Sequence, residues 1–473
     1  MKKKILAAAL ALSMCLGLWG CGDKKEDSTG SANNGEPASQ SANNDEPTSQ
    51  SANSGNTEAY TDNYQPKAEN LAGGASAGRK ENLSYNSGSS ADTSVEDGVY
   101  AGDYSEMSRA SLKLFRTVLD QGKAGENVLL SPYSIDEALG MTAHGAAGTT
   151  RTEMEKVMGG DVKLEHISPS LCFLTNQMEK DEEVSWNVAN SIWINSENQV
   201  LTGLSRSYLD EVGKYYSPEI YSLPFDEAAG DEINAWVNHN TDGMIQKIID
   251  GRPDGSMHLI NAVAFDGEWA VEYEETAVHE DQDFTNADGS VSKVNMLSSE
   301  ESSYFELNKG LGFIKYYKGY NYAFVGILPP EGQTAEDYIR SLTDANADLS
   351  KAFLDAKSGT VHAKMPEFET EYGNELSEEL QAAGMASAFS PSADFSNFNG
   401  SGGLSISSVI HKTYIDVNRK GTRAAAVTDV AIKETAIEMD EPVIITLDRP
   451  FVYAIVDGYT GTPLFLGIQN TMN

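Results

Sequence analysis

The sequence changes character near residue 102, and this change limits which part of the chain can build a folded core. Between residues 22 and 100 small and polar residues dominate, and a decapeptide recurs as SANNGEPASQ at 31–40, SANNDEPTSQ at 41–50 and SANSGN at 51–56. Such a composition buries too little apolar surface to offset the entropy lost on ordering. We therefore predict a disordered, low-complexity tether over residues 21–101, with an end-to-end span of roughly 50 Å, and one folded domain over residues 102–473.

The folded part carries helical patterns first and strand patterns later. Apolar residues recur at helical spacing over 105–119, and 134–143 also suits a helix. Short β-rich runs follow at 185–194, 258–265, 312–316, 322–328, 361–365, 411–417, 443–447 and 451–456. This order predicts the α+β class, with large and mostly antiparallel sheets rather than alternating βαβ units.

The first twenty residues predict an export signal. Three lysines at 2–4 precede a mostly apolar stretch at 5–18, which is too short for a stable membrane span. The run LWGC at 18–21 resembles the lipobox of bacterial lipoproteins, in which the cysteine receives lipid and becomes the first mature residue. We expect residues 1–20 to be a signal peptide and Cys21 to anchor an extracellular, cell-surface lipoprotein in a bacterial membrane. An ordinary secretion signal with a chance cysteine is the alternative.

The chain lacks the motifs of several function classes. A formal net charge of −37 disfavours nucleic acid and bare anionic membranes as partners. Three cysteines exclude a disulfide framework, and the seven histidines form neither an HExxH motif nor a convincing metal spacing. The run GASAG at 74–78 has the spacing of a hydrolase nucleophile elbow around Ser76, but it lies in low-complexity sequence rather than between a strand and a helix. We therefore expect no enzyme activity, metal or cofactor, with a hydrolase using Ser76 as a competing hypothesis.

Residues 419–442 carry an unusual pattern. Read with a period of two, one face has only small or β-branched residues: Thr422, Ala424, Ala426, Thr428, Val430 and Ile432. The opposite face carries the charges: Arg423, Ala425, Val427, Asp429, Ala431 and Lys433. This pattern is typical of a half-buried strand, yet its charged flanks are typical of an exposed loop. Three consecutive alanines also favour a helix, so periodicity alone leaves a helix, a permanent strand and a mobile strand open.

Five motifs resemble those of the serpins, a family of serine protease inhibitors. They are NVLLSPYSI at 127–135, NAWV with TDGMI at 234–245, NAVAFDGEW at 261–269, the hinge-like RKGTRAAAVT at 419–428, and RPFV with LFLG at 449–467. The resemblance covers about residues 103–473. Two positions depart from the usual pattern: Arg419 stands where inhibitory members usually have an acidic residue, and Asp266 replaces a usual lysine.

The resemblance implies a large, mostly antiparallel central sheet with further sheets, helices mainly in the N-terminal part, and an exposed reactive-centre loop. It also implies inhibition by a suicide route, in which a serine protease forms a covalent acyl complex with the loop and the cut loop inserts as a strand into the central sheet. The loop hinge would contain Gly421, Thr422, Ala424, Ala425, Ala426 and Thr428. Small inward side chains favour insertion, so we expect an inhibitory, metastable monomer.

Other positions carry over from the same motifs. Trp269 would lie at the top of the sheet, where the loop first enters. A polar cluster beneath the middle of the sheet, where strands must part, would contain Ser131, Ser134, Asn261 and His411. His411 lies outside the five motifs but ten residues before Gly421, as the cluster histidine of the family does. No cluster of basic residues occurs in the helical region after residue 160, so heparin-type activation is not expected.

The resemblance also implies which bond a protease would cut. In serpins the residue before the cut bond usually lies about fourteen residues after the hinge glycine; counted from Gly421 this is Thr435, which implies cleavage between Thr435 and Ala436. A small residue at the cut favours an elastase-like or subtilisin-like protease. Counting back from the C-terminal motif reaches Met439 instead, and Lys433 would suit a trypsin-like protease. The alternatives are an inhibitor of a cysteine or trypsin-like protease, and a non-inhibitory binding or adhesion lipoprotein on the same scaffold.

Overall fold

The computed structural model describes residues 64–73, 79–88, 98–197, 203–422 and 441–472, all within the unit Glu58–Asn473. Residues 1–20 and Cys21 lie outside the described residues. No described helix is long and apolar enough to cross a membrane. The helices are α1 (Ala101–Gln121), α2 (Pro132–Gly145), α3 (Gly148–Gly159), α4 (Leu164–Met178), α5 (Arg206–Val212), α6 (Glu227–Asn240), α7 (Ala335–Asp344), α8 (Leu349–Leu354), α9 (Ser377–Ala382), α10 (Ala386–Phe389), α11 (Ser396–Asn399) and the short 3-10 helix η3 (Glu275–Ala277).

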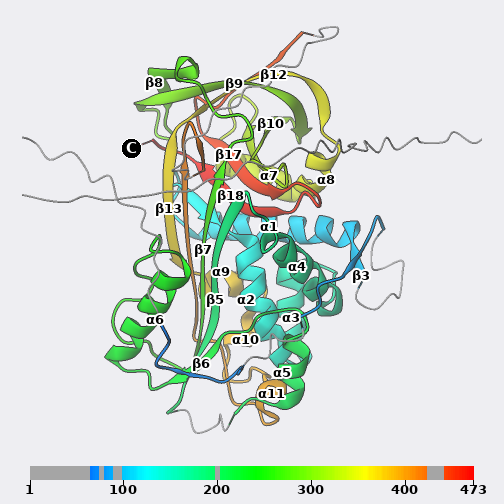
Figure 1. Cartoon of the computed structure of the whole chain (residues 1–473), viewed down its shortest axis with the longest axis vertical. Coiled ribbons are helices and arrows are strands. Elements are labelled where there is room, and N and C mark those ends of the chain that lie inside the picture. The colour runs from blue at the N-terminus through cyan, green and yellow to red at the C-terminus, as the bar shows by residue number, and fades with distance from the viewer. Residues whose placement is uncertain (1–63, 74–78, 89–97, 198–202, 423–440, 473) are drawn as a thin grey trace, which may run out of the picture. The chain divides into compact units, whose positions relative to one another are not determined.

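Helix α2 is set by its local sequence and by the core around it. The Ser131 side chain caps the helix by accepting a hydrogen bond from the backbone N–H of Ser134 at 3.2 Å, and Pro132 occupies the first helical position. Every residue of α2 except His144 is buried. The helix therefore lies inside the protein, against the central sheet and among α3, α4 and α5 (Figure 1).

The central sheet has the strand order β1-β6-β5-β7-β15-β14-β13. Its strands are β1 (Glu69–Asn70), β6 (Ile220–Leu223), β5 (Val184–Asn195), β7 (Met257–Glu268), β15 (Gly421–Thr422), β14 (Ser408–Val417) and β13 (Phe368–Glu375). The β5–β7 and β13–β14 pairs are antiparallel, whereas β5–β6 and β7–β14 are parallel. Figure 1 shows β5 and β7 running along the length of the molecule, with α6 on one side and α1–α4 on the other.

A second sheet has the order β16-β12-β9-β10-β11-β17-β18-β4, with β8 paired to β9. Its strands are β16 (Val443–Thr446), β12 (Lys357–Pro366), β9 (Val291–Leu307), β10 (Gly310–Tyr316), β11 (Tyr322–Leu328), β17 (Phe451–Asp457), β18 (Pro463–Gln469), β4 (Val128–Leu130) and β8 (Val278–Thr285). Each of the eight predicted β-rich runs falls on a strand of one of the two sheets, and the predicted helices fall on α1 and α2. The α+β class is confirmed.

The tether prediction is wrong for two stretches before residue 101. Strand β1 pairs with the edge strand β6, and β2 (Ser84–Asn86) pairs with β3 (Gly98–Tyr100). Between them, the backbone carbonyl of Lys80 accepts a hydrogen bond from Asn176 of α4 at 2.8 Å. The physical reason is that a few aromatic and aliphatic side chains in this polar stretch, such as Tyr85 and Leu71, pack against the hydrophobic core. An unpaired sheet edge also offers backbone hydrogen bonds that composition does not reveal.

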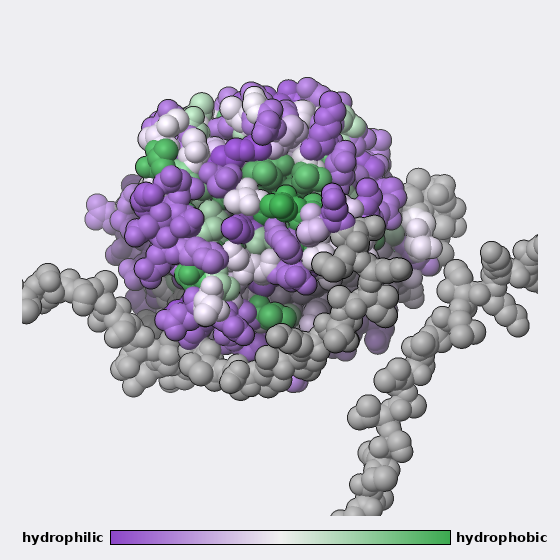
Figure 2. All heavy atoms as spheres, turned by 90° about the horizontal axis from the view of Figure 1, so that it is seen from above, coloured by the Kyte–Doolittle hydropathy of each residue, from purple (hydrophilic) through white to green (hydrophobic). Residues whose placement is uncertain are grey.

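The face of the protein seen from above is mainly hydrophilic. Hydrophilic side chains cover most of it and separate several small hydrophobic groups (Figure 2). The large hydrophobic side chains with the highest exposure include Val271, Tyr320 and Ile444. Scattered exposure of this kind is normal for a protein surface.

Candidate functional site

The expected hinge begins inside the central sheet. Strand β15 lies between β7 and β14, where Gly421 pairs with Glu268 and Thr422 pairs with Gly267 and Val417. Both of these pairings are antiparallel. Below this level β7 and β14 pair directly, in parallel, from Ser408 opposite His258 to Tyr414 opposite Ala264. We call this direct pairing the seam; it is closed along its length, and β15 occupies the gap above it.

The two hinge residues fit this gap closely. A Cβ atom on Gly421 would lie 2.2 Å from the carbonyl oxygen of Gly267, so only glycine fits without moving the backbone. Thr422 is fully buried, and its Oγ1 lies 2.6 Å from the hydroxyl oxygen of Tyr317. The first residue of the small, uncharged face therefore already points into the protein.

Trp269 follows β7 and contacts the chain just before the hinge. Its indole Nε1 donates to the carbonyl of Asn418 at 2.9 Å, and its backbone N–H donates to the carbonyl of Lys420 at 2.9 Å. Its ring stacks on Tyr317 with a centroid distance of 4.5 Å. The Lys315 ammonium lies 5.4 Å from the centroid of the same indole, and burial lowers the pKa of Lys315. Trp269 thus holds the entry of β15 from both its backbone and its side chain.

The four residues expected beneath the sheet lie together, and all are fully buried. The backbone N–H of Ser131 donates to Nε2 of His411 at 3.1 Å, so the proton of the neutral ring lies on Nδ1. That Nδ1 bonds to Oδ1 of Asn261. The Asn261 amide then donates to Oγ of Ser134 at 2.5 Å and to Oδ1 of Asn190 at 2.6 Å. Ser134 also donates to Asn190 at 2.9 Å.

This polar cluster crosses the seam. His411 of β14 and Asn261 of β7 are direct register partners, and their side chains bond to each other. Burial lowers the pKa of His411 to about 3. A protonated ring could not accept from the Ser131 N–H, so the cluster needs the neutral form. The members of the cluster bond to one another or to the backbone, so the cluster holds strands β7 and β14 together.

Comparison with known proteins decides the family. The family model for serpins (serine protease inhibitors) matches residues 105–471. The chain belongs to the serpin family. Serpins are protease inhibitors rather than enzymes, which agrees with the lack of an enzyme motif in the sequence.

This serpin is similar in sequence or structure to several known members of the family. Iripin-5 of Ixodes ricinus is 29% identical over 358 residues, which cover 73% of this chain and 89% of Iripin-5. Human thyroxine-binding globulin is 29% identical over 357 residues, covering 72% of this chain and 83% of the globulin. The structure of the thermophilic serpin tengpin in its native state matches with a TM-score of 0.72 at 35% identity, covering 86% of this chain and all of tengpin.

Three residues of this serpin's site were not found from the sequence. Tyr317 and Asn418 contact the hinge and Trp269, and Asn190 joins the polar cluster. The signal for Asn190 was an amide in the middle of a β-rich run, where an uncharged polar side chain needs a partner. Nothing in the local sequence marked Tyr317 or Asn418, because the contact of Tyr317 with Thr422 and that of Asn418 with Trp269 join residues far apart along the chain.

The remaining predicted site residues lie outside the described residues, so their assignments stay predictions. These are the hinge residues Ala424, Ala425, Ala426 and Thr428, the reactive-bond candidates Lys433, Thr435, Ala436 and Met439, and Cys21. Ser76 of the competing hydrolase hypothesis also lies there. The contribution of Trp269 and the polar cluster to loop insertion is likewise a prediction.

Proposed function

We propose that this serpin inhibits a serine protease as a suicide substrate, through insertion of its cut reactive-centre loop into the central sheet. The observation that carries the proposal is the position of β15. Its two residues lie between β7 and β14, and Thr422 is buried beneath the sheet. Residues 423–432 continue from this point with an uncharged, small inward face.

The direction of β15 gives the driving force. A strand that continues from β15 runs antiparallel to both of its neighbours, whereas the seam that it replaces is parallel. One set of slanted hydrogen bonds is thereby exchanged for two antiparallel ladders, which are slightly more stable per residue. We propose that these added backbone hydrogen bonds drive insertion once the loop has been cut.

The cut bond and the target class follow from the loop sequence. We propose cleavage between Thr435 and Ala436 by an elastase-like or subtilisin-like protease, with Met439 and Lys433 as the alternative positions. The protease would remain attached as a covalent acyl complex. We also propose that Cys21 carries lipid and that the protein acts as a monomer at the bacterial cell surface, on a tether formed by residues 21–63.

A non-inhibitory function is the second candidate. Its support is the similarity to thyroxine-binding globulin, a protein named for a ligand rather than for inhibition. Arg419, which stands where inhibitory serpins usually have an acidic residue, points in the same direction. A cysteine protease target is a further variant of the inhibitory proposal.

Incubation of the mature protein with elastase, subtilisin, trypsin and a papain-like protease separates these functions. Inhibition predicts an SDS-resistant complex, and mass spectrometry of the released C-terminal peptide identifies the cut bond. Complete cleavage without any complex, in every reaction, would reject inhibition of these protease classes. A catalytically inactive subtilisin serves as the control, since it cannot form the acyl bond.

A further inference from the structure

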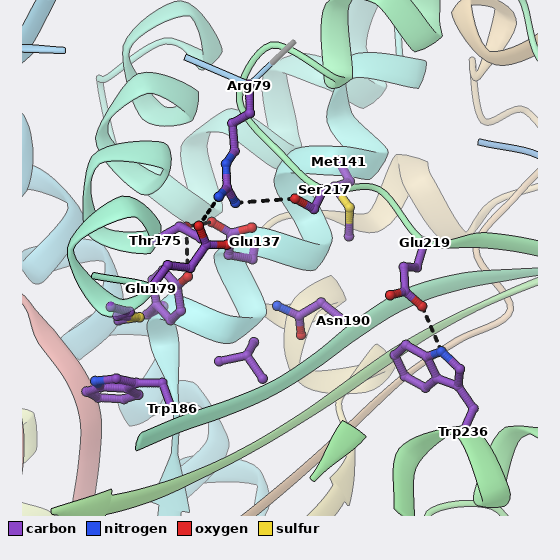
Figure 3. A pocket seen from close by; sticks show the side chains of 13 residues that line it. Arg79, Glu137, Met141, Thr175, Glu179, Trp186, Asn190, Ser217, Glu219 and Trp236 are labelled. Carbon is purple, nitrogen blue, oxygen red and sulfur yellow. Dashed lines mark hydrogen bonds and ion pairs between the residues drawn. The ribbon is translucent and has the colours of Figure 1, made fainter. Parts of the chain in front are cut away.

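A cavity of about 240 Å³ lies between strand β5 and helices α2 and α4, away from the hinge. Strand β5 contributes Trp186, Val188 and Asn190 to its lining, and the helices contribute Glu137 and Met141 of α2 and Thr175 of α4. Figure 3 shows the carboxylates of Glu137 and Glu179 on the helix side, opposite Asn190 and Trp186. For comparison, an apolar cavity of about 150 Å³ takes up benzene. The volume therefore suits one ring with a short side chain.

The cavity carries an excess of negative charge. Its lining includes Glu137, Glu179 and Glu219, and Arg79 is the only cation among the described lining residues. Arg79 is already engaged, since its guanidinium forms an ion pair with Glu179 and donates to Ser217 at 3.3 Å. Arg79 also interacts favourably with the charge of Glu137, so the three carboxylates of the lining share a single cation.

Glu137 is the most deeply buried of these three. Its residue exposure is only 7%, and its Oε1 accepts a hydrogen bond from Thr175 at 2.9 Å. Burial raises the pKa of Glu137 to about 7, although the charge of Arg79 and the hydrogen bond from Thr175 act in the opposite direction. A cation in the cavity would offset the cost of burying this charge.

Glu219 lies at the opposite end of the cavity. Its Oε2 accepts from the Trp236 indole at 2.7 Å and from the Tyr221 hydroxyl at 2.6 Å. In Figure 3 its second oxygen points toward the cavity, on the side of Asn190. The lining also includes the apolar side chains of Met141, Val188 and Trp186.

From this arrangement we propose that the cavity binds a small primary amine with an apolar body, such as an aryl-ethylamine. Its ammonium group pairs with the Glu137 carboxylate, and its ring packs against Trp186, Val188 and Met141. The site shares no residue with the hinge.

The occupied site also contacts the polar cluster. Asn190 lines the cavity, and its Oδ1 accepts from Ser134 and Asn261. A ligand between β5 and the two helices fixes their relative position. We therefore expect bound amine to raise the melting temperature of the uncut protein.

The test is isothermal titration of the mature protein with 2-phenylethylamine, 2-phenylethanol and 3-phenylpropionate, which have similar size and opposite or no charge. We expect the amine to bind at least about tenfold more tightly than the alcohol, and the acid not to bind. Glu137→Gln should weaken amine binding about tenfold, while Val188→Phe should abolish binding of every probe by filling the cavity. The exposed substitution Glu280→Gln is the matched control.

Three outcomes would overturn the proposal: equal affinity for amine and alcohol, amine binding that survives both cavity substitutions, or no saturable binding up to about 10 mM. The comparison of probes uses the unmodified protein, so the proposal stays testable even if one variant fails to fold.

Discussion

Thr428 provides the sharpest test of loop insertion, because the register of β15 assigns it a specific partner. Thr422 pairs with Gly267 of β7, and antiparallel pairing moves the two positions in opposite directions. Six residues further, from 422 to 428 and from 267 to 261, Thr428 lies opposite Asn261. The same count along β14, from 417 to 411, places it opposite His411. The inserted hydroxyl would thus enter between the two side chains that bond across the closed seam.

The substitution Thr428→Val removes this hydroxyl and keeps the shape of the side chain. Insertion separates Asn261 from His411, and without the hydroxyl each is left without its partner in a buried place. An unsatisfied buried polar group costs about 1–3 kcal/mol. The cleaved form should therefore be less stable by about this amount. The uncut form should be unchanged, because the two side chains already bond to each other there.

The assay compares guanidinium unfolding of the uncut and loop-cleaved forms, for Thr428→Val, for the unsubstituted protein and for Thr428→Ser, which retains the hydroxyl. We expect cleavage to raise the stability of all three proteins, but least in the valine variant. Equal stability of the cleaved valine and unsubstituted forms would refute the register argument. No gain on cleavage in any of the proteins would refute insertion itself.

Three further predictions test the hinge and the polar cluster. Thr422 is already buried in the uncut protein, so Thr422→Arg should force β15 out of the sheet. After cleavage, insertion from this point would have to bury the guanidinium, at a cost of several kcal/mol. At about 1.4 kcal/mol for each tenfold change in rate, the variant should be cleaved as a substrate, and a normal yield of SDS-resistant complex would contradict this. Gly421→Ala would press a methyl group on the carbonyl of Gly267, so β15 should leave the sheet and limited proteolysis should cut near the hinge faster than in the unsubstituted protein. The folded protein keeps His411 uncharged down to about pH 3, whereas the unfolded chain takes up its proton below about pH 6.5. Stability should therefore fall as the pH drops through this window, by up to about 1.4 kcal/mol per pH unit. The variant His411→Gln should show a smaller fall in melting temperature between pH 7 and pH 5 than the unsubstituted protein. The exposed substitution His362→Gln is the control. If His411→Gln leaves the fall in melting temperature unchanged, His411 does not cause the pH dependence.

The strands that were predictable from sequence are those with continuous β-branched and aromatic runs, such as β11 and β17. Strand β9 was not predicted, because its sequence VSKVNMLSSEESSYFEL is rich in serine and charge. Its strand form comes from its neighbours, since β8, β10 and β12 all pair with it. The same reason explains β1, two residues of low β propensity held by the edge of β6.

Only some residues of the candidate site could be predicted from the sequence. The hinge, Trp269 and four cluster residues lay in motifs with fixed spacing, so their proximity was predictable from the resemblance. Asn190 and Tyr317 belong to no such motif, and only the tertiary fold brings them to the site. Periodicity gives the faces of a strand and not its neighbours. It therefore could not predict that β15 lies above a closed seam, or that the two strands of the seam are parallel.

The seam explains how one chain can be both stable and poised to change. Opening it costs the direct β7–β14 hydrogen bonds and the bond between His411 and Asn261. An uncut loop is held at both ends, by Thr422 in the central sheet and by Val443 in the second sheet, so it cannot supply a full strand in return. In the proposed mechanism, cleavage would free one end, and the incoming strand would replace one parallel ladder by two antiparallel ones. The trigger would then be a change in chain connectivity, and we expect the polar cluster to set the barrier that the freed strand must cross.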